Sequence, residues 1–304
     1  MSELNVEQVS YDVARALTED LGIPLPNPLP QAGEGVNVGL WPPRAINDLT
    51  AQLIPATQAA RARVVCREPA VIAGRPWFDA CFRVLDPGCG INWQVKEGDW
   101  VATGAVLVEI SGNARALLTA ERPALNFLQT LSAVATATRP YVAAVAGTHA
   151  AILDTRKTLP GLRIAEKYAV RVGGGQNQRV GLYDGILIKE NHITAAGGIA
   201  PVMQAALKLA AGRVSVQIEV ETLAQLREAL SAGAELILLD NFDLEQMHEA
   251  VALTAGRALL EASGNITLET VRAVAETGVD RISIGGLTKH VHAVDLSMRI
   301  DSDD

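Results

Sequence analysis

Short runs of aliphatic residues alternate with helix-like stretches throughout the second half of the chain. The runs are rich in Ile, Leu and Val, as expected for strands buried on both faces of a parallel sheet. Between them, apolar residues recur at the spacing of an amphipathic helix. The predicted strands cover residues 151–153, 186–188, 214–220, 236–239, 258–261 and 281–284, and the predicted helices cover 165–172, 201–211, 223–232, 244–254 and 268–277.

This alternation predicts parallel strands joined by right-handed helical connections. A regular barrel needs about eight such strands, and only six aliphatic runs are present. We therefore expect an open or incomplete α/β barrel, with any further strand supplied by another part of the chain.

The first half of the chain has a different pattern. Residues 24–43 are too rich in Pro, Gly and Asn for a helix or strand, which predicts a loop. The extended runs that follow this segment predict a small, mostly antiparallel sheet. The predicted helices cover 6–21 and 122–137, and the extended runs cover 62–71, 81–85, 91–95 and 106–110.

Polar or glycine-rich residues follow each predicted strand of the second half. The carboxyl ends of parallel strands meet at one face of a barrel, so these residues are expected to surround one mouth. Arg156, Lys157 and Lys189 suit an anion. Glu219 and Asp240 suit a metal ion or a developing positive charge.

Composition narrows the classes of function. The chain of 304 residues has a net charge of −8 at pH 7, which disfavours binding to nucleic acid or acidic lipid. Neither a secretion signal nor a run of about 18 apolar residues is present. Cysteine usage, with an odd count and no CxxC pair, predicts reduced thiols in a cytoplasmic protein. The three cysteines are Cys66, Cys81 and Cys89.

Five motifs in order along the chain resemble those of the quinolinate phosphoribosyltransferase family. The resemblance extends from about Leu49 to the end of the chain, and the joint occurrence of the motifs is far more specific than any one alone. The motifs are ERPALNF at 121–127, DTRKTLPGLR at 154–163, GGG at 173–175, LIKENH at 187–192 and LDNF at 239–242.

The resemblance implies an N-terminal α+β open-sandwich domain followed by an incomplete α/β barrel of about six or seven strands. The expected domains are residues 1–130, joined by 289–304, and residues 131–288. It also implies a homodimer with shared active sites, or a hexamer, in which Arg122 reaches into the neighbouring subunit's site.

The activity implied by the resemblance is Mg²⁺-dependent transfer of phosphoribose from phosphoribosyl pyrophosphate to quinolinate. Decarboxylation then gives nicotinate mononucleotide, CO₂ and pyrophosphate for NAD synthesis. These substrates carry several carboxylate and phosphate oxygens, which arginine and lysine bind well. The residues implied to contact them are Arg122, Thr155, Arg156, Lys157, Gln178, Arg179 and Lys189.

The resemblance further implies that Lys157, Glu219 and Asp240 are catalytic. The two carboxylates would lie beside the ribose and its Mg²⁺, binding the metal directly or indirectly. The 5′-phosphate is expected after the last two predicted strands, where barrel proteins bind phosphate through backbone N–H groups. The residues there are Ser263, Gly264, Asn265, Gly285, Gly286 and Lys289.

Two positions depart from the family pattern. Gln178 stands where relatives usually carry histidine, and Lys289 also stands at a position where many relatives carry histidine. Gln178 can donate a hydrogen bond but cannot carry charge, so affinity or pH dependence is expected to differ.

Three alternative interpretations follow from the residues. One is a paralogous phosphoribosyltransferase for another aromatic acid, and another is an inactive, ligand-sensing homologue, for which Gln178 is the only support. The segment 95–101 is also similar to the hairpins of lipoyl and biotinyl carrier domains. That third interpretation fails because no lysine stands at a hairpin tip.

Overall fold

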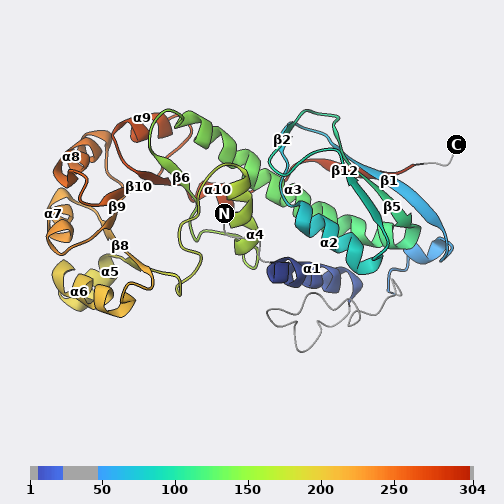
Figure 1. Ribbon diagram of the computed structural model, residues 1–304, viewed down its shortest axis with the longest axis horizontal. Coiled ribbons are helices and arrows are strands. Elements are labelled where there is room, and N and C mark those ends of the chain that lie inside the picture. Colours follow the sequence, from blue (N-terminus) through green and yellow to red (C-terminus); the bar gives the residue numbers. More distant parts are fainter. Residues whose placement is uncertain (1–5, 23–46, 302–304) are drawn as a thin grey trace. The chain divides into compact units, whose positions relative to one another are not determined.

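The computed structural model describes residues 6–22 and 47–301. The chain divides into two compact units (Figure 1). The first comprises 1–136, 160–173 and 291–304, and the second comprises 137–159 and 174–290. The predicted loop at 24–43 lies outside the described residues.

A four-stranded antiparallel sheet forms the centre of the first unit, in the order β12-β1-β5-β3. Its central pair shows the expected period of two, since Ala62, Val64 and Cys66 of β1 are buried alternately. The prediction of a small, mostly antiparallel sheet is therefore confirmed. The strands are β1 (Ala59–Cys66), β3 (Gly90–Trp93), β5 (Val106–Asn113) and β12 (Leu296–Ile300), with a separate pair of β2 (Ala70–Val71) and β4 (Trp100–Val101).

One predicted strand in this unit is wrong. Residues 81–85 belong to helix α2 (Arg75–Leu85), not to an extended segment. The helix starts after Gly74, whose φ of 108° suits glycine, and has Pro76 in its first turn, where the missing N–H costs nothing. Its buried face consists of Trp77, Phe78, Cys81 and Phe82. Seen alone, the short apolar run at 81–85 could not be distinguished from a strand.

Three further helices belong wholly or mainly to the first unit. Helix α1 (Val6–Leu21) has the predicted bounds, and α4 (Arg163–Val172) lies close to the prediction. Helix α3 (Ala114–Ala144) is longer than the predicted 122–137. Its Ser132 hydroxyl bonds to both backbone groups of Ala73, which fixes the chain after β2 against the helix. A short 3₁₀ helix, η2, covers Ala51–Leu53.

The second unit contains a six-stranded sheet in the order β6-β11-β10-β9-β8-β7, with every pair parallel. Strands β6 and β7 are the two edges, so the barrel is incomplete, as the aliphatic pattern predicted. The strands are β6 (Ala151–Leu153), β7 (Gly185–Ile188), β8 (Ser215–Val220), β9 (Leu236–Asp240), β10 (Leu259–Ser263) and β11 (Arg281–Ser283).

Helices follow the outer side of this curved sheet (Figure 1). Predicted and observed positions agree for α6, α7 and α8, whereas α5 begins directly after β7 and has no counterpart in the prediction. The helices are α5 (Glu190–Ala196), α6 (Ile199–Ala210), α7 (Leu223–Ser231), α8 (Leu244–Thr254), α9 (Val271–Glu276) and α10 (Gly286–Lys289).

No single helix within residues 6–22 and 47–301 is both long enough and apolar enough to cross a bilayer. The consecutive helices α5 and α6 reach that length and composition only together, and a bend of 99° separates them.

Candidate active site

The ends of β7 and β8 bring a cation and a carboxylate together. Lys189 follows β7 and is the N-cap residue of α5, and Glu219 is the penultimate residue of β8. The Nζ of Lys189 donates to Oε2 of Glu219 at 2.6 Å. The Glu219 side chain is 9% exposed whereas that of Lys189 is 47% exposed, so the lysine approaches a buried carboxylate from the solvent side.

Asp240 ends β9, and its neighbours belong to the end of β10. The side-chain Nδ2 of Asn241 donates to Asp240 Oδ2 at 2.9 Å. The backbone nitrogen of Asn241 donates to the backbone carbonyl of Ser263. Gly264 has a φ of 109°, and a Cβ there would overlap the Asn241 side chain. Asn265 also has a positive φ, of 45°. A tight turn therefore places the predicted phosphate-binding residues of β10 beside Asp240.

Lys157, which follows β6, lies against the turn after β11. A Cβ built on Gly285 would stand 2.9 Å from Lys157 Cδ and 3.5 Å from Thr155 Oγ1. The Thr288 hydroxyl of α10 donates to the Lys157 carbonyl at 2.8 Å, and the Lys157 amide donates to Thr155 Oγ1 at 3.1 Å. Only a glycine at 285 leaves the lysine side chain this position.

Arg156 and Arg179 of the same unit lie close enough for their positive charges to interact. Burial and the positive charge of Arg156 both lower the pKa of Arg179, while Asp184 opposes the shift. Arg179 Nη1 donates to the Gly185 carbonyl at 3.0 Å, and its buried Nε has no acceptor within the described residues. Two guanidinium groups with a spare buried donor favour an anionic ligand.

Gln178 is anchored from two directions. Its backbone nitrogen donates to Asp154 Oδ1 at 2.9 Å, and its side-chain Nε2 donates to Gln217 Oε1 at 2.8 Å. Asn177 also donates to the second Asp154 oxygen. Asp154, which is fully buried after β6, thus shapes the loop that carries Gln178 and Arg179.

Two buried polar residues of the barrel interior were missed by sequence reasoning. Gln217 lies within β8 and Glu261 within β10, and both are almost fully buried. A polar residue inside an otherwise aliphatic strand was the available signal, since barrel interiors are dominated by branched aliphatic side chains.

Arg122 and Lys289 are less constrained. Arg122 lies on α3 in the first unit, its side chain is 60% exposed, and Glu121 is 3.9 Å away. Lys289 is exposed at the end of α10, and Gly286 is the first residue of that helix. That Arg122 serves a neighbouring subunit stays a prediction.

Metal binding by protein groups alone has little support in the described ranges 6–22 and 47–301. No three His, Cys, Asp or Glu side chains gather there closely enough to hold an ion. Glu219 and Asp240 still fit a Mg²⁺ site in which substrate oxygens complete the coordination, because Mg²⁺ is usually held by one or two carboxylates plus phosphates.

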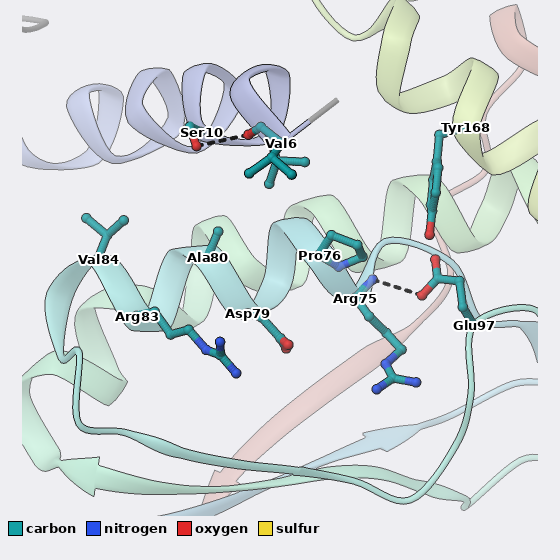
Figure 2. Close-up of a pocket in the computed structure, with 11 residues that line it drawn as sticks. Val6, Ser10, Arg75, Pro76, Asp79, Ala80, Arg83, Val84, Glu97 and Tyr168 are labelled. Atoms are coloured by element: carbon teal, nitrogen blue, oxygen red, sulfur yellow. Dashed lines mark hydrogen bonds between the residues drawn. The ribbon is translucent and has the colours of Figure 1, made fainter. Parts of the chain in front are cut away.

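The first unit also contains a cavity of about 560 Å³, between α1 and α2 (Figure 2). Its Glu97 carboxylate is already bonded, since it accepts from the backbone nitrogens of Gly74 and Arg75. Burial and Glu97 raise the pKa of the Tyr168 hydroxyl, which points toward that carboxyl group. This largely apolar cavity has two arginines, Arg75 and Arg83, but they share it with the carboxyl groups of Asp79 and Glu97.

Together, the parallel sheet and its strand ends define an α/β-barrel enzyme whose substrates are anionic. Cations, carboxylates and turn glycines occupy the ends of consecutive strands, where such enzymes carry their active sites. Comparison with known proteins supplies the particular family. Models of the quinolinate phosphoribosyl transferase N-terminal and C-terminal domains match residues 48–132 and 134–299.

Individual relatives point to the same family as the two domain models. The probable nicotinate-nucleotide pyrophosphorylase (carboxylating) of Bacillus subtilis strain 168 is 44% identical over 253 residues, covering 83% of this chain and 88% of that protein. Quinolinate phosphoribosyltransferase (decarboxylating) 2a, mitochondrial, of Nicotiana tabacum is 39% identical over 277 residues, covering 85% and 78%. The structure of the nicotinate-nucleotide pyrophosphorylase from Francisella tularensis superposes with a TM-score of 0.87 at 38% identity, covering 99% of this chain and all of that one. The chain therefore belongs to the quinolinate phosphoribosyltransferase family.

Proposed function

We propose that this protein transfers phosphoribose from phosphoribosyl pyrophosphate to the ring nitrogen of quinolinate. Loss of the 2-carboxylate as CO₂ then gives nicotinate mononucleotide. The observation that carries the proposal is the ion pair of Lys189 and Glu219 at one mouth of the barrel, in the unit that also holds Arg156, Arg179 and Lys157. Family membership supports the same reaction.

Quinolinate would be held by arginine side chains. Arg156 and Arg179 present guanidinium groups that can bind carboxylates in a bidentate manner. Burial, and after it the positive charge of Arg156, lower the pKa of Arg179, and a bound anion would offset both effects. Gln178 would add a neutral hydrogen bond next to them. Its orientation is restrained by Asp154 and Gln217.

Glu219 and Asp240 would stabilise the ribose as its bond to pyrophosphate breaks. Positive charge develops on the sugar ring at that point, and fixed carboxylates on the ends of β8 and β9 oppose it electrostatically. Without substrate, Lys189 neutralises Glu219. Mg²⁺, held by these carboxylates together with substrate oxygens, would supply charge neutralisation for the departing pyrophosphate.

The phosphate end of the second substrate would lie at the turns after β10 and β11. Backbone N–H groups and nearby lysines suit phosphate oxygens there. Lys157 is the lysine whose side chain lies against the β11 turn. The residues proposed for this end are Ser263, Gly264, Asn265, Gly285, Gly286 and Lys289.

Decarboxylation needs no further protein group. Once ribosylation makes the pyridine nitrogen cationic, the bond to the 2-carboxylate breaks and leaves its electron pair on C2, next to that nitrogen. A proton from solvent then completes the product. Positioning and charge stabilisation therefore account for the catalysis that the protein supplies.

The remaining parts of the proposal concern assembly and location. We propose a homodimer, alone or within a hexamer, in which Arg122 completes the partner's quinolinate site; its exposed side chain supports this. A cytoplasmic location is proposed from the three free cysteines, Cys66, Cys81 and Cys89.

Turnover with phosphoribosyl pyrophosphate, Mg²⁺ and quinolinate labelled in its 2-carboxyl group tests the function. Equal amounts of CO₂ and nicotinate mononucleotide are expected. A nucleotide formed from nicotinate, without CO₂ from quinolinate, would instead identify a phosphoribosyltransferase for another aromatic acid. Absence of turnover with both acids, in a protein that still binds either one, would indicate a ligand sensor.

A further inference from the structure

A line of hydrogen bonds crosses the interior of the second unit beneath Gln178. Gln178 Nε2 donates to Gln217 Oε1 at 2.8 Å, and Gln217 Nε2 donates to Glu261 Oε2 at 2.9 Å. The Ser283 hydroxyl bonds to the same Glu261 carboxyl group. The line therefore joins the Gln178 loop to β8, β10 and β11.

These residues form a layer directly below the proposed catalytic carboxylates. Side chains two residues apart on a strand project from the same face, so Gln217 shares a face of β8 with Glu219. By the same rule Glu261 shares a face of β10 with Ser263. Gln217 is 6% exposed and Glu261 is 1% exposed. Such a layer in a barrel is normally aliphatic.

Burying these groups costs free energy, the more so because Glu261 Oε1 has no hydrogen-bond partner within residues 6–22 and 47–301. This cost argues that the layer has a purpose beyond packing. Around Glu261, Asp154 is a nearby negative charge, Arg281 a nearby positive one, and Leu238 its register neighbour on β9. Burial is the main cause of the raised pKa of Glu261, and Asp154 adds to it. The carboxyl group is thus biased toward its neutral form.

We propose that Gln217 and Glu261 are positioning residues, which act on the heteroaromatic dicarboxylate substrate through Gln178. The inference rests on the proposed function only in that Gln178 contacts this substrate. Gln217 holds the Gln178 amide in one orientation, and Glu261 holds Gln217. A glutamine is more flexible than the histidine usual at this position, so it needs such support to present a fixed hydrogen bond beside Arg179.

The test measures the affinity for quinolinate by titration calorimetry in the full-length protein. Gln217→Met is expected to raise the quinolinate Kd about five- to tenfold, the value of roughly one hydrogen bond, and to leave the Kd of phosphoribosyl pyrophosphate unchanged. In a Gln178→Ala background the same substitution is expected to have no further effect. Glu261→Gln keeps an acceptor and a donor and should retain most of the affinity, whereas Glu261→Met should not.

Thr277→Val provides the matched control. Its hydroxyl is buried and bonded to the Val274 carbonyl in the same unit, away from Gln178. It is expected to lower thermal stability without changing either Kd. Should Gln217→Met fail to fold, the comparison of Glu261→Met with Glu261→Gln probes the line from its other end.

The inference would be overturned if Gln217→Met lowered the quinolinate affinity further in the Gln178→Ala background. It would also be overturned if Gln217→Met weakened the binding of quinolinate and of phosphoribosyl pyrophosphate equally. Unchanged quinolinate affinity in folded Gln217→Met would overturn it as well. Turnover of the unmodified protein is measured in parallel to separate the two proposals. Quinolinate binding with the expected coupling but without turnover would contradict only the proposed function, whereas active protein with additive variants would contradict only the positioning roles.

Discussion

Lys189 donates to Glu219 at 2.6 Å across the ends of two adjacent parallel strands. The carboxylate is nearly buried, and the lysine covers it from solvent. In the proposed reaction, the pair would keep the negative charge of Glu219 compensated until a cationic sugar ring forms next to it. Exchange of one positive partner for another avoids leaving a buried carboxylate uncompensated, which is costly in proteins.

Glu219→Gln is expected to reduce kcat by about 10²- to 10³-fold, a typical loss when one preorganised electrostatic group is removed from an active site. Glutamine has nearly the same size, so folding should be little affected. Steady-state kinetics and thermal unfolding measure the two effects. Glu221→Gln is the control, because Glu221 is exposed two residues further along. Similar losses in both variants would contradict the role given to Glu219.

Gly285→Ala is expected to lower kcat/KM for phosphoribosyl pyrophosphate by roughly tenfold, since small displacements of catalytic groups are costly. The new Cβ would stand 2.9 Å from Lys157 Cδ and displace that side chain. The φ of Gly285 is −68°, so alanine introduces no backbone strain.

Gly286→Ala offers the comparison for this prediction. The nearest atom to a Cβ there is 3.8 Å away, so a smaller loss is expected. Kinetics with each substrate varied in turn would measure both variants. A larger loss in Gly286→Ala than in Gly285→Ala would show that crowding of Lys157 is not the cause.

Lys157→Ala should abolish measurable turnover while the fold stays intact. The side chain is exposed and its backbone is held by Thr155 and Thr288, so the substitution removes charge without removing structure. Lys208→Ala, on the exposed side of α6, controls for the loss of one surface charge. Substantial activity in a folded Lys157→Ala protein would remove this residue from the site.

The architecture of the second unit was predictable because each of its strands is a recognisable aliphatic run in the sequence. Each aliphatic run is short, is bounded by turn residues, and is followed by polar or glycine-rich residues. The number of strands and the residues at their carboxyl ends could therefore be predicted from the sequence. Lys189 and Glu219 were found this way, and the structure joins them in an ion pair. Charge and position along a strand are local properties of a sequence.

Other features depend on packing that no local pattern reveals. The last residues of the helix at 75–85 were wrongly predicted as a strand. The helix buries Phe78 and Phe82 on one face, and this burial depends on tertiary packing. The partnership of Gln217 with Glu261 joins residues separated by 44 positions on different strands. Only the strand order brings these two side chains together.

A stability prediction concerns Asp12 in the first unit. This carboxyl group is almost fully buried and accepts from the indole of Trp77 at 2.9 Å and from Gln8 at 2.7 Å. Asp12→Ala would leave the Trp77 N–H buried and unbonded, which is expected to cost about 1–3 kcal/mol of unfolding free energy. Asp12→Asn keeps an acceptor and should cost less. Equal losses in urea denaturation would argue against the hydrogen bond as the cause.

Glu261 makes stability depend on pH in a defined direction. Burial raises its pKa above the value of 4.5 that an unperturbed glutamate has. Below that value it is protonated in both the folded and unfolded states. Above it, and up to the folded-state pKa, only the folded protein keeps the proton, so unfolding releases a proton and the unfolding free energy falls as pH rises.

Within that interval each pH unit removes about 1.4 kcal/mol from the unfolding free energy. Gln cannot titrate, so the stability of Glu261→Gln relative to the unmodified protein should increase from pH 4.5 upward and then level off above the folded-state pKa of Glu261. Urea denaturation of both proteins at closely spaced pH values measures this difference, in which the contributions of their shared titrating groups cancel. A difference that stays constant with pH would mean that Glu261 has the same proton affinity in both states, and that burial between Gln217 and Ser283 does not perturb it.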